Sequence, residues 1–351
     1  MTTLTVPTRP EEDASLRPVP WRRMAWVTWR QHRAALAGVA VFLGALAVGL
    51  WLAGLKTHHA YAAAVAACQQ PSSVGCGNAV NTLIGTNGFL SNGVILQAVP
   101  PLIGAFIGGP MLAREMETGT FRYAWTQGFG RWRWTLAKLV PLAVTVAAAT
   151  GALSVLLSWY YQPYFAPDNP ALGIPGETPF APGVFDLRGV GFAAWTLAAF
   201  AIGALAGMLI RRVVPAIAAT LVAYAALAFA AGGLLRPHYL APLVTSNPNV
   251  PGNAWIHGQW WTQGGKTVFS GGWPPQTVLD RFCSSVPSGL YGKASSQGLV
   301  QCLSQHGYTQ WTSYTPATRF WPFQWIESGW LLALSALLIA ATVWLVRRRA
   351  A

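Results

Sequence analysis

Residues 190–235 read VGFAAWTLAAFAIGALAGMLIRRVVPAIAATLVAYAALAFAAGGLL. Arg211 and Arg212 are the only charged residues in this stretch. The runs on either side, 190–210 and 213–235, each have about the 20 apolar residues that a helix needs to cross the hydrocarbon core of a bilayer. The stretch therefore predicts two antiparallel membrane-spanning helices joined by a short basic turn.

Four further apolar runs of similar length extend this pattern. The six predicted spans are 34–55, 94–113, 139–160, 190–210, 213–235 and 329–346, and none contains Asp, Glu, Lys or Arg. Inside a bilayer, helices and closed barrels are the structures that satisfy all backbone hydrogen-bonding groups. Apolar runs of this length are typical of helices, so we expect an all-α integral membrane fold with six transmembrane helices. Pro100 and Pro101 remove backbone donors from the second span, which we expect to be the least regular helix or, alternatively, a re-entrant segment.

Composition supports a membrane protein and argues against nucleic-acid binding. The chain is 53% hydrophobic and 9% charged, whereas about a quarter of the residues in a soluble protein are charged. Its net charge of +13 comes from basic residues at the ends of spans, not from one basic stripe with stacking aromatics. We therefore expect the lipid bilayer, and no nucleic acid, as a partner.

The basic residues also predict the orientation in the membrane. By the positive-inside rule, the face with most of the Lys and Arg near the spans is cytoplasmic, which puts both termini inside. Fourteen basic residues lie on that face: Arg22, Arg23, Arg30, Arg33, Arg114, Arg122, Arg131, Arg133, Lys138, Arg211, Arg212, Arg347, Arg348 and Arg349. The opposite face has Lys56, Arg188, Arg236 and Arg319. We expect the first span to remain as an anchor, because it is too long for the core of a signal peptide.

All four cysteines lie in loops that this orientation places outside the cell. They are Cys68, Cys76, Cys283 and Cys302. An even number of cysteines in an oxidising compartment favours disulfides. Pairing Cys68 with Cys76 and Cys283 with Cys302 is the most local of the three possible connectivities, and free thiols are the alternative.

The loop at 236–328 is long enough for a small extracellular domain. It contains Trp255, Trp260, Trp261, Trp273 and Trp311. These rings either bind sugars or lipid head groups by stacking, or form the core of the domain and its contact with the membrane interface. Gly264-Gly265-Lys266-Thr267 is similar to the end of a phosphate-binding loop, but Trp260 stands where that motif needs its first glycine, so we expect no ATP site here. No histidine spacing indicates a metal site.

The segment after the second span has an unusual composition. Arg114-Glu115-Met116-Glu117-Thr118-Gly119-Thr120 is followed by Phe121, Tyr123 and Trp125. The acids and aromatic residues suit either a surface that contacts a partner protein or a loop anchored to lipid head groups. Because the spans lack the charged groups that ion-coupled carriers and membrane-embedded proteases use, we expect the energy source to lie outside the bilayer.

The Glu-x-x-x-Gly-Thr pattern at 115–120, followed by a basic and aromatic stretch and Lys138, resembles permease subunits of bacterial type-2 ABC exporters. The N-terminal region 1–33 is also similar to the amphipathic interfacial helix of that family, with basic residues on one side and apolar residues on the other. Its residues here include Trp21, Arg22, Arg23, Trp29 and Arg30. The 236–328 loop departs from the smaller members of the family.

The resemblance implies a non-catalytic transport subunit of the bacterial cell membrane. It implies pairing with a second permease copy or paralogue and with a cytoplasmic ABC ATPase, which binds ATP and Mg while this chain binds no cofactor. Residues 115–127 would form the coupling helix, with Glu115, Glu117, Gly119, Thr120, Phe121 and Trp125 as its candidate residues. The substrate is unknown, and we expect export. Gly203 and Ala206 are small residues that suit close helix packing, between subunits or within one.

The implied organisation has four parts. They are the tail and interfacial helix 1–33, the first five spans 34–235 with the coupling segment 114–138, the extracellular domain 236–328, and the last span with its basic tail, 329–351.

Two other functions are supported less well by the sequence. An enzyme would need paired carboxylates, but the outer acids are scattered at Asp168, Glu177, Asp186, Asp280 and Glu327. A ligand-binding sensor acting through the Trp-rich loop lacks a cytoplasmic output domain.

Overall fold

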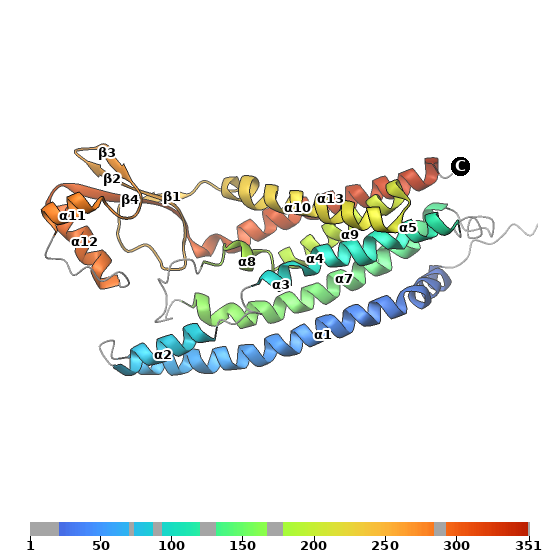
Figure 1. Cartoon of the computed structure of the whole chain (residues 1–351), viewed down its shortest axis with the longest axis horizontal. Coiled ribbons are helices and arrows are strands. Elements are labelled where there is room, and N and C mark those ends of the chain that lie inside the picture. Colours follow the sequence, from blue (N-terminus) through green and yellow to red (C-terminus); the bar gives the residue numbers. More distant parts are fainter. Residues whose placement is uncertain are drawn as a thin grey trace, which may run out of the picture.

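The computed structural model describes residues 21–69, 74–86, 93–119, 131–166, 178–283 and 293–349. Its described part is a long helical bundle with a small sheet domain at one end, opposite the C-terminus (Figure 1). Six helices are long and apolar enough to cross a membrane, as the sequence predicts. They are Leu36–Ala67, Ile95–Thr118, Trp132–Phe165, Gly191–Ile210, Val213–His238 and Ala317–Arg348.

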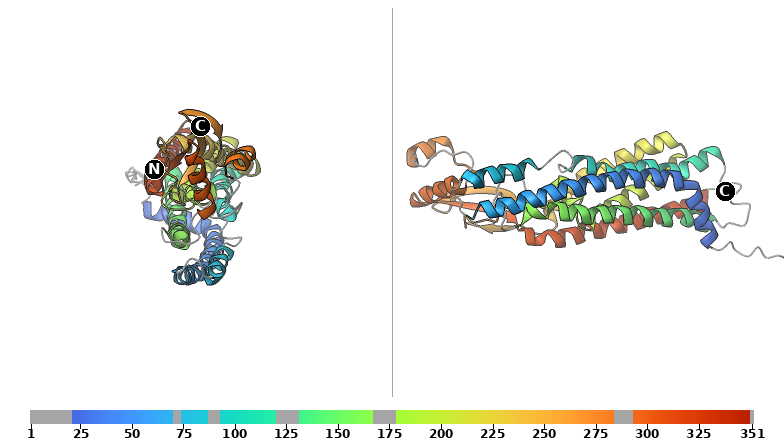
Figure 2. Two further views of the ribbon diagram at one scale, coloured as in Figure 1. Left: turned by 90° about the vertical axis from the view of Figure 1, so that its left-hand side faces the viewer. Right: turned by 90° about the horizontal axis from the view of Figure 1, so that it is seen from below.

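The first helix is much longer than its predicted span. Helix α1 runs without a break from Trp21 to Ala67, and 47 residues at about 1.5 Å each give about 70 Å, far more than the hydrocarbon thickness of about 30 Å. Its first turns bend away from the rest of the helix (Figure 2). Part of the predicted loop 56–93 is therefore helical, including α2 (Val74–Gly85), which packs against α1.

The second span is the least regular one, as predicted. It consists of α3 (Val94–Gln97), α4 (Val99–Ile103), the π-helix η1 (Gly104–Gly108) and α5 (Gly109–Thr118). Pro100 and Pro101 lie in the first turns of α4, where a proline displaces few backbone hydrogen bonds. The pieces follow one another along the bundle (Figure 1), so the re-entrant alternative is wrong.

Helix α9 (Gly191–Ile210) occupies the centre of the bundle. It packs against α5, η1, α10 (Val213–Ala230), α7 (Arg131–Tyr161) and α13 (Phe320–Arg349). A methyl group on Gly203 would overlap the carbonyl oxygen of Gly104, and one on Gly207 would overlap that of Gly109. Glycine is therefore required for the backbones of α9 and the second span to approach so closely. Gly203 packs within the subunit.

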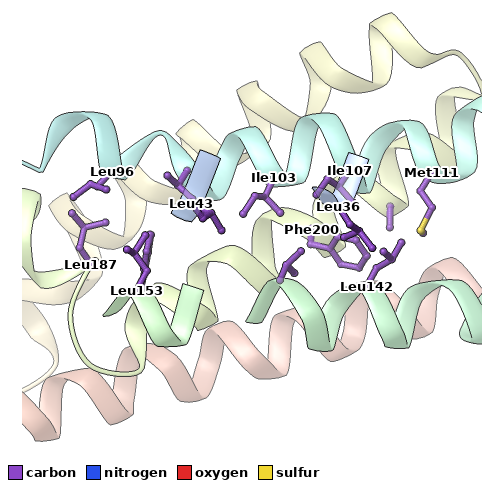
Figure 3. Close-up of a cluster of buried hydrophobic side chains, with 14 of the residues drawn as sticks. Leu36, Leu43, Leu96, Ile103, Ile107, Met111, Leu142, Leu153, Leu187 and Phe200 are labelled. Atoms are coloured by element: carbon purple, nitrogen blue, oxygen red, sulfur yellow. The ribbon is translucent and has the colours of Figure 1, made fainter. Parts of the chain in front are cut away.

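Apolar side chains from α1, the second span, α7 and α9 form the main core. Figure 3 labels nine of them together with Leu187, which follows α8: Leu36, Leu43, Leu96, Ile103, Ile107, Met111, Leu142, Leu153, Leu187 and Phe200. Helix α10, in contrast, leaves about half of its apolar side chains exposed and fully buries only Ala216 and Thr220, as expected of a surface that faces lipid or another membrane subunit.

The end of the fifth span and the start of the sixth also differ from their predicted positions. Helix α10 continues through the π-helix η3 (Ala231–Leu235) into the short helix η4 (Arg236–His238). Helix α13 begins at Phe320, nine residues before the predicted start of the sixth span, and so it contains Glu327. Short helices η2 (Gln162–Phe165) and α8 (Pro182–Phe185) cover the same end of the bundle.

The long loop folds around an antiparallel sheet, so the prediction of an all-α fold is wrong here. Its elements are β1 (Leu243–Thr245), β2 (Trp255–Gln263), β3 (Lys266–Ser270), α11 (Gln276–Phe282), α12 (Lys293–Gln305) and β4 (Tyr308–Thr315), followed by η5 (Ala317–Arg319). The strand order is β1-β4-β2-β3. Gly264 and Gly265, both with positive φ, form the β2–β3 hairpin turn, and thus the residues similar to a phosphate-binding loop have a different structural role.

Candidate functional site

The end of α5 and the start of α7 lie at the end of the bundle where α13 also ends (Figure 1). Of the residues predicted there, the structure describes Glu115, Glu117 and Gly119, whereas Thr120, Phe121 and Trp125 lie outside the described residues. Gly119 ends α5 in the left-handed conformation, with φ of 71°. Glycine adopts this conformation with the least strain, which explains why the motif has a glycine at this position.

An ion pair joins the two ends of this segment. The Nζ atom of Lys138 on α7 donates to Oε1 of Glu115 on α5. Lys138 is only 4% exposed, and its ammonium also lies 4.4 Å from the centre of the Trp134 ring. A buried ammonium needs an opposite charge, so this pair fixes the last turn of α5 against the start of α7.

A second acid holds a third helix. Glu117 Oε2 accepts a hydrogen bond of 3.2 Å from the backbone N–H of Val213, the first residue of α10. The Arg212 side chain does not cap this helix, and a carboxylate at a helix N-terminus is stabilised by the free N–H groups and by the helix dipole. Arg211 takes a positive φ of 60°, which makes the turn from α9 to α10 tight. Glu117 thereby ties α5 to this turn.

The predicted interfacial residues belong to the first turns of α1. Arg22, Trp29 and Arg30 are exposed. The side chains of Trp21 and Arg23 lie outside the described part of the chain.

The opposite end of the bundle contains a buried ionic cluster that the sequence analysis missed. Arg236, 2% exposed, donates from Nε and Nη2 to the two carboxylate oxygens of Glu327, over 3.0 and 2.7 Å. Nη2 also donates to Asp186. The guanidinium lies 4.2 Å from the centre of the Phe185 ring. Three residues predicted to be scattered in outer loops therefore meet at one point.

Neighbouring side chains complete the hydrogen bonding of Glu327, which is 1% exposed. Trp195 on α9 donates its indole N–H over 2.9 Å, and the Tyr239 hydroxyl donates over 3.2 Å. Burial raises the pKa of Asp186 to about 7; the positive charge of Arg236 opposes this shift, and the nearby Glu327 carboxylate adds to it. The cluster joins α8, α9, η4 and α13.

Both cysteine pairs lie at the same end of the bundle as this cluster, and each forms a disulfide. Cys68 is bonded to Cys76 with a Cα–Cα distance of 4.6 Å, and Cys283 to Cys302 with a Cα–Cα distance of 6.0 Å. The structure thus has the most local of the three connectivities. No cysteine is free within the described segments.

A family model described as ABC-2 membrane transporter related matches residues 40–236. The chain belongs to this family. The match covers more than half of the sequence and ends at Arg236, so the sheet domain and α13 lie beyond it. No curated protein and no solved structure matches the chain. Family membership and the six apolar helices make this chain a multi-pass membrane protein and a transport subunit of an ABC transporter.

The geometry of the acids fits a transport subunit better than an enzyme. Asp186 and Glu327 are close together, but Arg236 lies between them and takes the hydrogen bonds that a general acid or base would need. Asp280 is exposed on α11 and accepts from Gln276. Asp168 and Glu177 lie outside the described residues. In the part of the chain that the structure describes, no group of His, Cys, Asp and Glu is arranged to hold a metal ion.

Proposed function

We propose that this ABC-2 permease works with a separate cytoplasmic ABC ATPase, which docks on the segment between α5 and α7, and that the complex exports a substrate across the bacterial cell membrane. ATP and Mg then belong to the ATPase, and a second permease copy or paralogue completes the complex. The proposal rests on the family match. The observation that carries its coupling part is that Glu115 and Glu117 tie this segment to two other helices.

The two acids suit a positioning role in this proposal. Each has a partner within the chain, Glu115 in Lys138 and Glu117 in the Val213 N–H, so we assign them to holding the docking segment and not to contacting the ATPase themselves. A push on a segment fixed to α5, α7 and α10 moves all three helices together. Because α5 and α10 both pack on the central α9, the movement reaches the middle of the bundle.

The proposed orientation has both termini and the α5–α7 segment in the cytoplasm. Supporting it, the α9–α10 turn with Arg211 and Arg212 contacts α5 through Glu117, so these two basic regions share one end of the bundle. The disulfides and the sheet domain share the other end (Figure 1). Disulfides form in oxidising compartments, which favours placing this second end outside the cell.

Co-purification tests the coupling. A tagged chain is isolated from its own cells with mild detergent, and bound ABC ATPase is identified by mass spectrometry and assayed for ATP hydrolysis. Replacing both Glu115 and Glu117 by alanine releases the segment, so we expect less ATPase recovered and less hydrolysis per complex. Truncating one side of a desolvated charge pair costs about 2–5 kcal/mol.

The matched control is Asp280→Ala, which removes an exposed acid in the sheet domain. It should recover as much ATPase as the wild type. If the wild type retains no ABC ATPase, or if the double variant and Asp280→Ala retain equal amounts with equal hydrolysis, the coupling assignment is wrong.

A further inference from the structure

The sheet domain contains a cavity of about 200 Å³ between its sheet and α12. Gln259 and Trp261 on β2, Gln310 on β4 and Trp273 after β3 contribute to its wall. Pro248, Gly272, Leu299 and Val300 complete it. None of these lining residues is charged. A cavity of about 150 Å³ binds benzene, so this volume suits a single small ring, and a wall without charge favours an uncharged ligand.

Two glutamine side chains are held so that their carbonyl oxygens remain available. The Nε2 atom of Gln259 donates to Thr312 Oγ1, and that of Gln310 donates to the Gly272 carbonyl, both over 3.2 Å. Neither Oε1 atom accepts a hydrogen bond from the residues that the structure describes. The cavity wall therefore has two fixed acceptors, which match hydroxyl or amide donors on a ligand.

Trp273 contributes an exposed aromatic face to the cavity. It is 59% exposed, in contrast to Trp261 in the domain core and to Trp255, which stacks on Phe180 where the domain meets the bundle. The sequence leaves open whether these tryptophans stack on a ligand or form the core of the domain, and Trp261 and Trp255 have the core role. An exposed indole beside polar acceptors is typical of binding sites, where one side of the ligand is apolar and the other is hydrogen-bonded.

We propose that this cavity binds one residue of an uncharged saccharide. The C–H face of a pyranose ring stacks on Trp273, and its hydroxyl groups donate to the Oε1 atoms of Gln259 and Gln310. A sugar ring has hydroxyl donors at its rim, so one residue matches both the aromatic face of Trp273 and the two fixed acceptors. The domain lies beyond the family match, and the proposal is independent of ATPase coupling.

A glycan array tests the proposal with the full chain. The protein is held in nanodiscs or in a detergent without a sugar head group, because maltoside detergents would compete for the site. We expect binding to a subset of uncharged saccharides, and the strongest of these is then titrated by calorimetry. Trp273→Ala removes the stacking face and should weaken that saccharide at least about tenfold, and Gln310→Leu should weaken it as well.

Trp325→Ala is the matched control, because Trp325 is 62% exposed on α13 and lies outside the cavity. It should bind the saccharide as the wild type does. Non-reducing mass spectrometry of the Cys283–Cys302 peptide checks that each variant keeps its fold. Three results would overturn the proposal: no uncharged saccharide bound by the wild type, binding to acidic saccharides alone, or equal binding by Trp273→Ala and Trp325→Ala.

Discussion

Arg236 illustrates how single residues far apart in sequence build one site. Asp186 and Glu327 are separated from it by 50 and 91 residues. All three residues lie just beyond the apolar runs, so the sequence pattern places them in outer loops. One signal was available: Glu327 lies in FQWIESGW, an acid within an aromatic and apolar run, and such acids are usually buried with a partner.

The first prediction concerns this cluster. Glu327→Ala leaves the buried Arg236 with Asp186 as its one remaining acidic partner and removes the acceptor of Trp195 and Tyr239. We expect it to destabilise the protein by about 3–5 kcal/mol, seen as a lower thermal unfolding temperature in nanodiscs. Asp280→Ala, an exposed acid, should change stability by less than about 0.5 kcal/mol. Equal unfolding temperatures for the two variants would show that the cluster contributes nothing.

The Glu115–Lys138 pair permits a double-mutant cycle. Glu115→Ala leaves a buried ammonium without its carboxylate, so adding Lys138→Ala should recover part of the lost stability, with a coupling energy of about 0.5–3 kcal/mol. Glu117→Ala combined with Lys138→Ala is the control. Glu117 bonds the Val213 backbone, so these two effects should add. Additive effects in the Glu115 and Lys138 cycle would mean that the ion pair does not form.

At the scale of elements, the sequence predicts which helices exist but not where they end. Apolar length identifies all six spans, because the bilayer requires about 20 apolar residues whatever the packing. Helix α1 extends to Ala67 and α13 starts at Phe320, because helical hydrogen bonding continues past the apolar runs and hydropathy does not mark where it stops. The π-helix at Gly104–Gly108 depends on close packing with α9, which periodicity does not indicate.

The third prediction concerns this helix contact. Gly203→Ala places a methyl group against the Gly104 carbonyl, so α9 and the second span must move apart. We expect a loss of about 1–3 kcal/mol, measured as thermal stability. Gly151→Ala is matched to it, since Gly151 is also inside a helix but has open space around it, and alanine favours a helix over glycine. If Gly151→Ala proves the more harmful change, the close approach of these helices is wrong.

At the scale of the whole molecule, the sheet domain is the part that the sequence predicts least. Its size and its local cysteine pairs follow from the sequence, but the strand order β1-β4-β2-β3 pairs Leu243 with Tyr314. Contacts over such distances depend on the folded domain and not on local patterns. For the segment after the second span, the sequence is more informative than for the sheet domain. Its resemblance to a family indicates a function that the apolar pattern alone does not reveal.

The fourth prediction concerns orientation. In intact cells, a membrane-impermeant reductant should open both disulfides, after which an impermeant maleimide labels Cys68, Cys76, Cys283 and Cys302. A cysteine introduced by Ala351→Cys is the control and should be labelled only after the cells are permeabilised. The reverse pattern, with Ala351→Cys labelled from outside and the native cysteines protected, would invert the proposed topology.

Site-specific photo-crosslinking tests the docking of an ABC ATPase on the segment between α5 and α7. A benzoylphenylalanine is introduced in place of Phe121 or Trp125, and in place of Trp273 as the control, in cells that express the whole transporter. We expect illumination to link the chain to an ABC ATPase from positions 121 or 125 and not from 273. Crosslinks from 121 and 125 to lipid alone, with no ATPase adduct, would contradict it and leave the segment as an interfacial anchor.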